Sequence, residues 1–142
     1  SIGEASLIND AYNSNPGSAR AALALLAQLG SGRQRVAVLG TMRELGARSA
    51  SAHAEIAREA LRSGASIVAG IGEFAAALRE VAPNDERVVT ATDVDDLWPV
   101  LRSRLSADAV ILLKASRGVR LERLLPSLIE WAAEDVSPYR TS

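Results

Sequence analysis

The sequence predicts an α/β fold, specifically a Rossmann-like three-layer αβα domain with a mostly parallel sheet. Short apolar runs alternate with helical segments along the 142 residues. The runs at 35–39 and 109–113 are almost wholly apolar, which is typical of parallel strands buried on both faces. Polar residues directly follow several runs, where open α/β sheets bind ligands. A succession of strand–helix units therefore indicates a doubly wound sheet with helices on both faces.

The expected elements form one domain, 1–134. We expect strands at 6–9, 35–39, 66–69, 87–90 and 109–113, and helices at 17–29, 49–63, 73–81, 94–104 and 121–133. The remainder, 135–142, contains Pro138 and little apolar content, so we expect a flexible tail. Because the chain begins with Ser1 rather than Met, we expect either a domain excised from a longer protein or a trimmed chain.

The first helix has clear start and stop signals. Its apolar stripe at helical spacing consists of Ala22, Leu23, Leu25, Leu26 and Leu29. Asn15 is a competent N-cap, Pro16 fits the first turn, and Gly30 is placed to end the helix.

Capping residues also delimit two later helices. Ser49 can cap the second helix and Gly64 can end it, while Asp93 can cap the fourth. The stretch G-I-G at 70–72 lacks the third glycine of a dinucleotide-binding loop, so it predicts a tight strand-to-helix turn.

Composition excludes several classes of function. The formal net charge of -1 gives no electrostatic basis for general nucleic-acid binding. Cysteine is absent, which excludes disulfides and thiolate metal sites. No apolar run reaches membrane-spanning length and no signal-peptide pattern opens the chain. We therefore expect a cytoplasmic protein with no nucleic-acid or membrane partner and no metal site of its own.

Three polar clusters follow strands, at 10–15, 40–46 and 114–118. Because the carboxyl ends of parallel strands meet at one edge of the sheet, we expect these clusters to converge there.

In the first cluster, Asp10 can accept hydrogen bonds from sugar hydroxyls or hold a metal through water, or it can be a turn or capping aspartate. Asn13 and Asn15 can donate to a ligand or form the turn. Tyr12 can pack on a base or on a neighbouring loop.

In the third cluster, Lys114 is the only lysine of the chain, and Ser116 and Arg117 follow it. Two cations, a hydroxyl and the N–H groups of the next helix would bind a carboxylate or phosphate; the alternative is a solvated loop with a capping serine. His53, the only histidine, has no partner for a metal pair or a catalytic triad, so we interpret it as structural or on the surface. Arg43 and Glu44 can pair with each other or contact another domain.

No G-x-x-x-x-G-K-[ST] loop is present, so if the domain serves ATP chemistry, another domain grips the phosphates. A stand-alone nucleotide-binding module remains an alternative. A receiver domain is disfavoured because no aspartate follows the third strand.

These motifs resemble those of the C-terminal domain of the Mur ligases. The stretch N-D-A-Y-N-S-N-P at 9–16 is similar to the family motif D-D-x-Y-N-A-N-P. The stretch V-A-V-L-G-T-M-R-E-L-G at 36–46 is similar to the motif V-x-G-D-M-x-E-L-G, and the stretch L-L-K-A-S-R at 112–117 is similar to the motif L-V-K-G-S-R. The family usually has a histidine where His53 falls. Among family members, the match is nearest to those that add D-alanyl-D-alanine to UDP-N-acetylmuramoyl-tripeptide. Three positions depart: Asn9 replaces an acidic residue, Thr41 an aspartate and Ala115 a glycine.

The resemblance implies a role in peptidoglycan precursor synthesis, and hence in cell-wall biogenesis, cell shape and division. It implies that ATP and Mg²⁺ are held mainly by a central ATPase domain, that another domain binds the UDP-substrate, and that this domain closes over both. It also implies that Asp10 and Asn13 approach the nucleotide. The residues that would place the D-alanyl-D-alanine are Asn15, Lys114, Ser116 and Arg117. The isolated domain is expected to be inactive. The C-terminal domain of another Mur-type ligase, including folylpolyglutamate ligases, remains a further alternative.

Overall fold

The computed structural model describes residues 5–136 and confirms the predicted α/β class. Five parallel strands form one sheet in the order β1-β5-β2-β3-β4. The elements in chain order are β1 (Ser6–Asp10), α1 (Pro16–Leu29), β2 (Arg35–Leu39), the 3₁₀ turn η1 (Gly46–Arg48), α2 (Ser49–Arg62), β3 (Ile67–Ile71), α3 (Glu73–Val81), β4 (Val88–Ala91), α4 (Val94–Arg104), β5 (Val110–Lys114), the 3₁₀ turn η2 (Leu121–Leu124) and α5 (Leu125–Val136).

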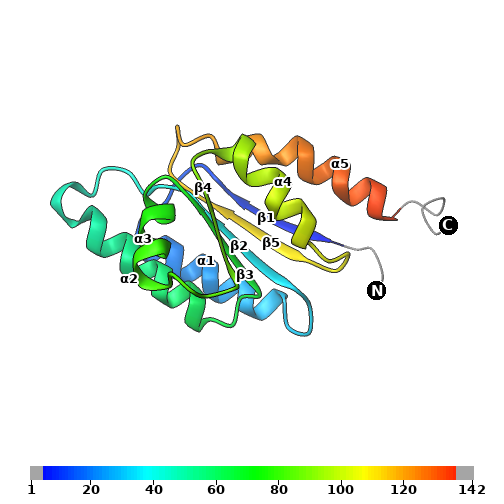
Figure 1. Ribbon diagram of the computed structural model, residues 1–142, viewed down its shortest axis with the longest axis horizontal. Coiled ribbons are helices and arrows are strands. Elements are labelled where there is room, and N and C mark those ends of the chain that lie inside the picture. The colour runs from blue at the N-terminus through cyan, green and yellow to red at the C-terminus, as the bar shows by residue number, and fades with distance from the viewer. Residues whose placement is uncertain (1–4, 137–142) are drawn as a thin grey trace.

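Helices cover both faces of the sheet, which gives three layers (Figure 1). Helices α1, α2 and α3 lie on one face, and α4 and α5 lie on the other. The central strands β2 and β5 send alternate side chains into two cores, as strand geometry requires. Val36, Val38, Ile111 and Leu113 belong to the core under α4 and α5, and Ala37, Leu39, Val110 and Leu112 belong to the core under α1, α2 and α3.

Two predicted helix caps are confirmed by hydrogen bonds. The side-chain oxygen of Asn15 accepts the Ser18 N–H at 2.9 Å, and Pro16 is the first residue of α1. The carboxylate of Asp93 accepts the Asp96 N–H at 2.9 Å at the start of α4. Both caps were readable from sequence because each bond spans only three residues.

The predicted cap at Ser49 is wrong. Ser49 is the first residue of α2, the N-cap position is Arg48, and no side chain caps this helix end. The turn η1 leads directly into α2, so the backbone is already helical where a capping residue would be extended. The Ser49 hydroxyl instead donates to Glu73 on α3 at 2.5 Å.

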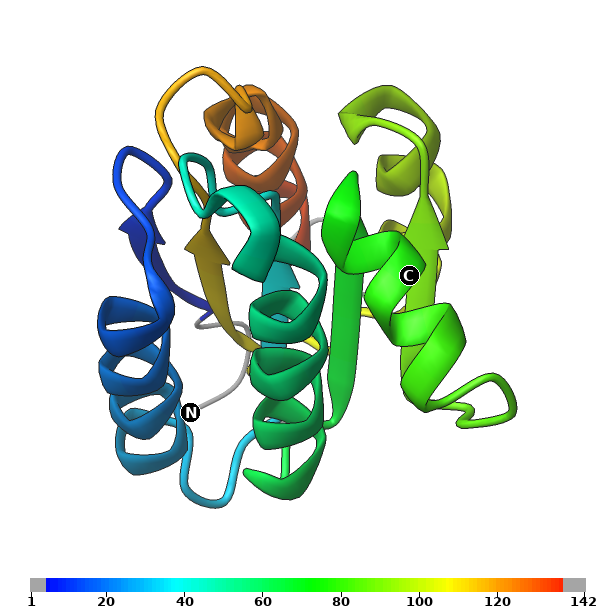
Figure 2. The same ribbon diagram turned by 90° about the vertical axis from the view of Figure 1, so that its left-hand side faces the viewer.

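The loops after β1, β2 and β5 lie side by side at the carboxyl edge of the sheet, as Figure 2 shows at its upper edge. The register explains this, because Lys114 of β5 lies opposite Asp10 of β1 on one side and Leu39 of β2 on the other. The predicted convergence of the three polar clusters is therefore confirmed.

Within residues 5–136, no helix has both the length and the apolar character needed to cross a membrane. Of the predicted tail, residues 137–142 lie outside the described part of the chain.

The turn before β4 contains the most strongly perturbed carboxylate among the described residues. The Arg87 guanidinium donates to both carboxylate oxygens of Asp85, at 3.0 and 2.7 Å. These bonds, aided by the Arg87 backbone N–H, lower the pKa of Asp85 from 3.8 to about 2. Because the pKa is lowered in the folded state, the pair stabilises the fold above pH 3.8, and this contribution is lost as the pH falls through about 2.

We expect Arg87→Gln to return the pKa of Asp85 towards 3.8, measured by NMR titration of the carboxyl carbon. The cost in unfolding free energy at neutral pH should be about 1 kcal/mol or less, because the pair is partly exposed. Arg58→Gln, which removes the same charge from an exposed position of α2, is the control. An Asp85 pKa that stays near 2 in Arg87→Gln would contradict the assignment.

Candidate functional site

The end of β5 holds an ion pair with the loop after β1. The Lys114 ammonium lies 2.6 Å from a carboxylate oxygen of Asp10 and donates to the backbone carbonyl of Asn13, also at 2.6 Å. The Lys114 side chain is 2 % exposed, whereas that of Asp10 is 45 % exposed. Lys114 is thus a buried cation that fixes the first loop, and Asp10 presents the accessible carboxylate.

Ser116 joins this loop to the other two. Its hydroxyl accepts the Arg43 N–H at 2.9 Å and donates to the Ser14 carbonyl at 3.2 Å. Its own N–H donates to the Thr41 carbonyl at 3.1 Å. Ser116 is buried. Its bond to Ser14 and those of Lys114 to Asp10 and Asn13 hold the same loop, so four predicted site residues (Asp10, Asn13, Lys114 and Ser116) lie close together.

The other two predicted site residues lie outside this group, on the exposed rim. Arg117 is exposed. Asn15 is also exposed, and its side-chain oxygen is already used to cap α1.

The 3₁₀ turn η2 begins at Leu121, where the last helix was expected to begin, so no helix N-terminus adjoins Lys114. The loop 115–120 intervenes, and Arg120 adopts a left-handed conformation (φ 65°) before η2 begins at Leu121. The Ser116 N–H serves the Thr41 carbonyl instead of a ligand.

Thr41 performs a function that the sequence did not reveal. Its hydroxyl accepts the Glu73 N–H at 3.0 Å and so caps α3, whose own N-cap residue, Gly72, has no side chain. Gly72 has φ 60°, and a Cβ there would lie 2.4 Å from the Thr41 hydroxyl oxygen. A carboxylate can accept the same hydrogen bond, so the aspartate that the resemblance leads us to expect at this position would also serve as a cap.

The remaining polar residues of the second cluster do not pair with each other. The Arg43 guanidinium donates to the Gly118 carbonyl at 3.3 Å rather than to Glu44. Glu44 is exposed, with a left-handed backbone (φ 65°). Tyr12 is half exposed on the first loop. His53 is fully buried, which confirms its structural interpretation.

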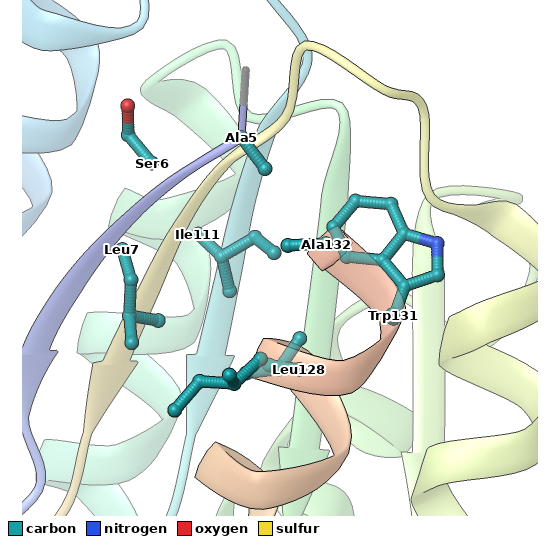
Figure 3. Close-up of a pocket in the computed structure, with 8 residues that line it drawn as sticks. Ala5, Ser6, Leu7, Ile111, Leu128, Trp131 and Ala132 are labelled. Carbon is teal, nitrogen blue, oxygen red and sulfur yellow. The ribbon is translucent and has the colours of Figure 1, made fainter. Parts of the chain in front are cut away.

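The cavities differ in chemistry: one is mainly apolar, whereas a cavity of about 380 Å³ is lined by Arg20, Arg48, Ser51 and Glu55. Figure 3 shows the mainly apolar one, of about 80 Å³, between β1 and α5, where Leu7 and Ile111 face Leu128 and Trp131. Apart from Ser6 and the indole N–H of Trp131, its lining is apolar, and it contains no acidic or basic side chain. Among the described residues, no group of three or more histidine or acidic side chains could hold a metal ion.

Comparisons with known proteins agree with the motifs at this site. The family model described as "Mur ligase, glutamate ligase domain" matches residues 1–117. The UDP-N-acetylmuramoyl-tripeptide--D-alanyl-D-alanine ligase of Treponema pallidum (strain Nichols) is 40 % identical over 122 residues, covering 84 % of this chain and 26 % of the relative. The ligase of the same name from Bacillus subtilis (strain 168) is 35 % identical over 128 residues, covering 88 % of this chain and 28 % of the relative.

A solved structure shows the same architecture. The MurF ligase from Thermotoga maritima in complex with ADP superposes with a TM-score of 0.71 at 26 % identity, over 90 % of this chain and 29 % of that one. The chain thus spans little more than a quarter of the length of the relatives that it matches.

We expect Thr41→Val to lower the unfolding free energy by about 1 kcal/mol, because it removes the cap of α3 with little change of shape. Thr41→Asp should keep most of the stability, since a carboxylate also accepts the Glu73 N–H. Urea unfolding measures both. Thr90→Val, at a half-buried strand position, is the control for exchanging a hydroxyl for a methyl group. Equal stability of Thr41→Val and wild type would rule out the cap.

Proposed function

Because this chain belongs to the Mur ligase family, we propose that it is the C-terminal domain of an ATP-dependent ligase that adds D-alanyl-D-alanine to UDP-N-acetylmuramoyl-tripeptide. The ligase would form an amide bond in the cytoplasm, in the synthesis of peptidoglycan precursors. The 40 % and 35 % identities to ligases of that name support this substrate over those of other Mur-type ligases.

One observation carries the proposal: the carboxyl edge bears a polar cluster without a phosphate-binding loop. The Asp10–Lys114 pair and Ser116 lie together at this edge, and the sequence contains no G-K-[ST] motif. A site of this kind is one half of a cleft, and the proposed central ATPase domain supplies the other half. The isolated chain is then expected to lack ligase activity.

Asp10 suits the nucleotide side of this cleft. Its carboxylate is half exposed and can accept hydrogen bonds from ribose hydroxyls while Lys114 holds one of its oxygens. Asn13 lies beside it, because its carbonyl accepts from the same ammonium. ATP supplies the phosphoryl group that activates the substrate carboxylate as an acyl phosphate. The described part of the chain offers no magnesium ligand set, so Mg²⁺ belongs to the central domain in this proposal.

The dipeptide side of the cleft consists of Asn15, Ser116 and Arg117, supported by Lys114. Arg117 is the exposed cation that can meet the carboxylate of D-alanyl-D-alanine. Ser116 is buried and bonded to two loops, so it sets the position of Arg117 next to it. Lys114 supports this side by holding the loop after β1 through Asp10 and the Asn13 carbonyl. These residues would act by positioning and charge stabilisation, and domain closure would exclude water from the activated carboxylate.

The test is steady-state kinetics of the full-length ligase with single substitutions. We expect Asp10→Ala to raise the KM for ATP about tenfold, because the loss of one charge-assisted hydrogen bond lowers the affinity by about that factor. Arg117→Ala should raise the KM for the dipeptide and leave that for ATP unchanged. Lys114→Ala should mainly impair use of the dipeptide, with a smaller rise in the KM for ATP, because Lys114 also holds Asp10.

Glu86→Ala, an exposed residue remote from the carboxyl edge, is the control and should match wild type. Wild-type kinetics in the Asp10 and Lys114 variants would remove the site assignment. Turnover by the 142-residue chain alone would show that it is not a half-site.

A further inference from the structure

His53 has both ring nitrogens engaged with backbone groups. Its Nε2 accepts the Met42 N–H at 2.9 Å, and its Nδ1 lies 2.7 Å from the Ser49 carbonyl oxygen. An amide N–H only donates and a carbonyl only accepts, so Nδ1 carries the proton and Nε2 the free lone pair. The two partners therefore fix one neutral tautomer of the ring.

Packing fixes the orientation of the same ring. His53 is fully buried on α2, and Phe74 of α3 meets it edge-to-face, with ring centroids 4.6 Å apart and planes at 69°. The Ser49 hydroxyl lies 3.3 Å from Nδ1 and donates to Glu73, whose carboxylate is 3.9 Å from the ring. The imidazole thus presents its Nε2 lone pair in one direction only, towards the loop after β2.

That loop, residues 40–45, has no regular secondary structure of its own. Met42 is buried, and its N–H is held by His53. The next residue, Arg43, bonds to Ser116 through its N–H and to Gly118 through its guanidinium. Glu44 follows with a left-handed backbone, a conformation that persists only where neighbouring contacts impose it.

We propose that His53 is a positioning residue that acts through the Met42 amide to hold the loop 40–45 against the loop after β5. It keeps Arg43 in place, and Arg43 in turn fixes Ser116 and Gly118 on either side of Arg117. The effect on substrate use rests on the proposed function, because Ser116 and Arg117 are the residues assigned to the dipeptide. The effect on the conformation of the loop does not depend on the proposed function.

Two substitutions separate this role from simple core packing. His53→Phe keeps an aromatic ring against Phe74 but has no acceptor for the Met42 N–H. His53→Gln loses the ring, yet its side-chain oxygen reaches the position of Nε2 and can accept that N–H. If His53 only fills space, His53→Phe should preserve the loop better than His53→Gln. If His53 positions the loop through its acceptor nitrogen, His53→Gln should preserve the loop better than His53→Phe.

The first measurement is NMR on the 142-residue chain. We expect nitrogen shifts of the Nδ1–H tautomer for His53 in wild type. In His53→Phe, the Met42 and Arg43 amides should exchange with solvent about tenfold faster or more, because a buried hydrogen bond is lost, while α1 amides keep their protection. His53→Gln should keep Met42 protection near wild type. Phe74→Leu, which disturbs the packing but leaves the His53 bond, is the matched control.

Wild-type protection of Met42 in His53→Phe, or an Nε2–H tautomer in wild type, would overturn the proposal. The second measurement uses the full-length ligase: His53→Phe should raise the KM for the dipeptide without changing that for ATP, and His53→Gln should restore it. If the full-length protein has no such activity, the proposed function fails, while Met42 exchange still decides the role of His53.

Discussion

The parallel register between β1 and β5 is the constraint on which the carboxyl edge depends. It sets Asp10 opposite Lys114, and the buried ammonium finds its counter-charge there. A cation removed from water needs such a partner, because an unpaired buried charge costs several kcal/mol. A slip of one residue would turn Asp10 to the other face of the sheet and leave Lys114 without a carboxylate. The ion pair therefore helps to select the register that brings the first and third loops together.

The groups at this edge divide into two kinds. Backbone and buried groups are satisfied within the domain: Ser116 bonds to the loops after β1 and β2, Thr41 caps α3, and His53 holds Met42. Asp10 and Arg117 are exposed, so their charged side chains are accessible to molecules outside the domain. A rigid frame carrying a few accessible charges is the arrangement that precise positioning of a substrate requires.

The sequence predicts the parts of the structure that depend on local or periodic signals. The apolar strands β2 and β5, the caps at Asn15 and Asp93, and the meeting of loops at one edge all follow from short-range chemistry and parallel topology. The prediction fails where contacts with an element distant in sequence determine the local conformation. Ser49 was misassigned as a cap because the 3₁₀ turn before it has no clear signature. The contacts of Thr41 and His53 join elements separated in sequence, so only coordinates reveal them.

The burial of Lys114 also determines how the domain responds to amine-directed chemistry. The sequence has a single lysine, and its amine is enclosed and ion-paired, so acylating reagents, aldehyde fixatives and lysine-modifying enzymes meet no accessible ε-amino group. All other side-chain cations that are formally charged at neutral pH are guanidinium groups, which these agents do not readily modify. Lysine-directed labelling of a longer protein that contains this chain would therefore mark the other domains and leave this one unlabelled.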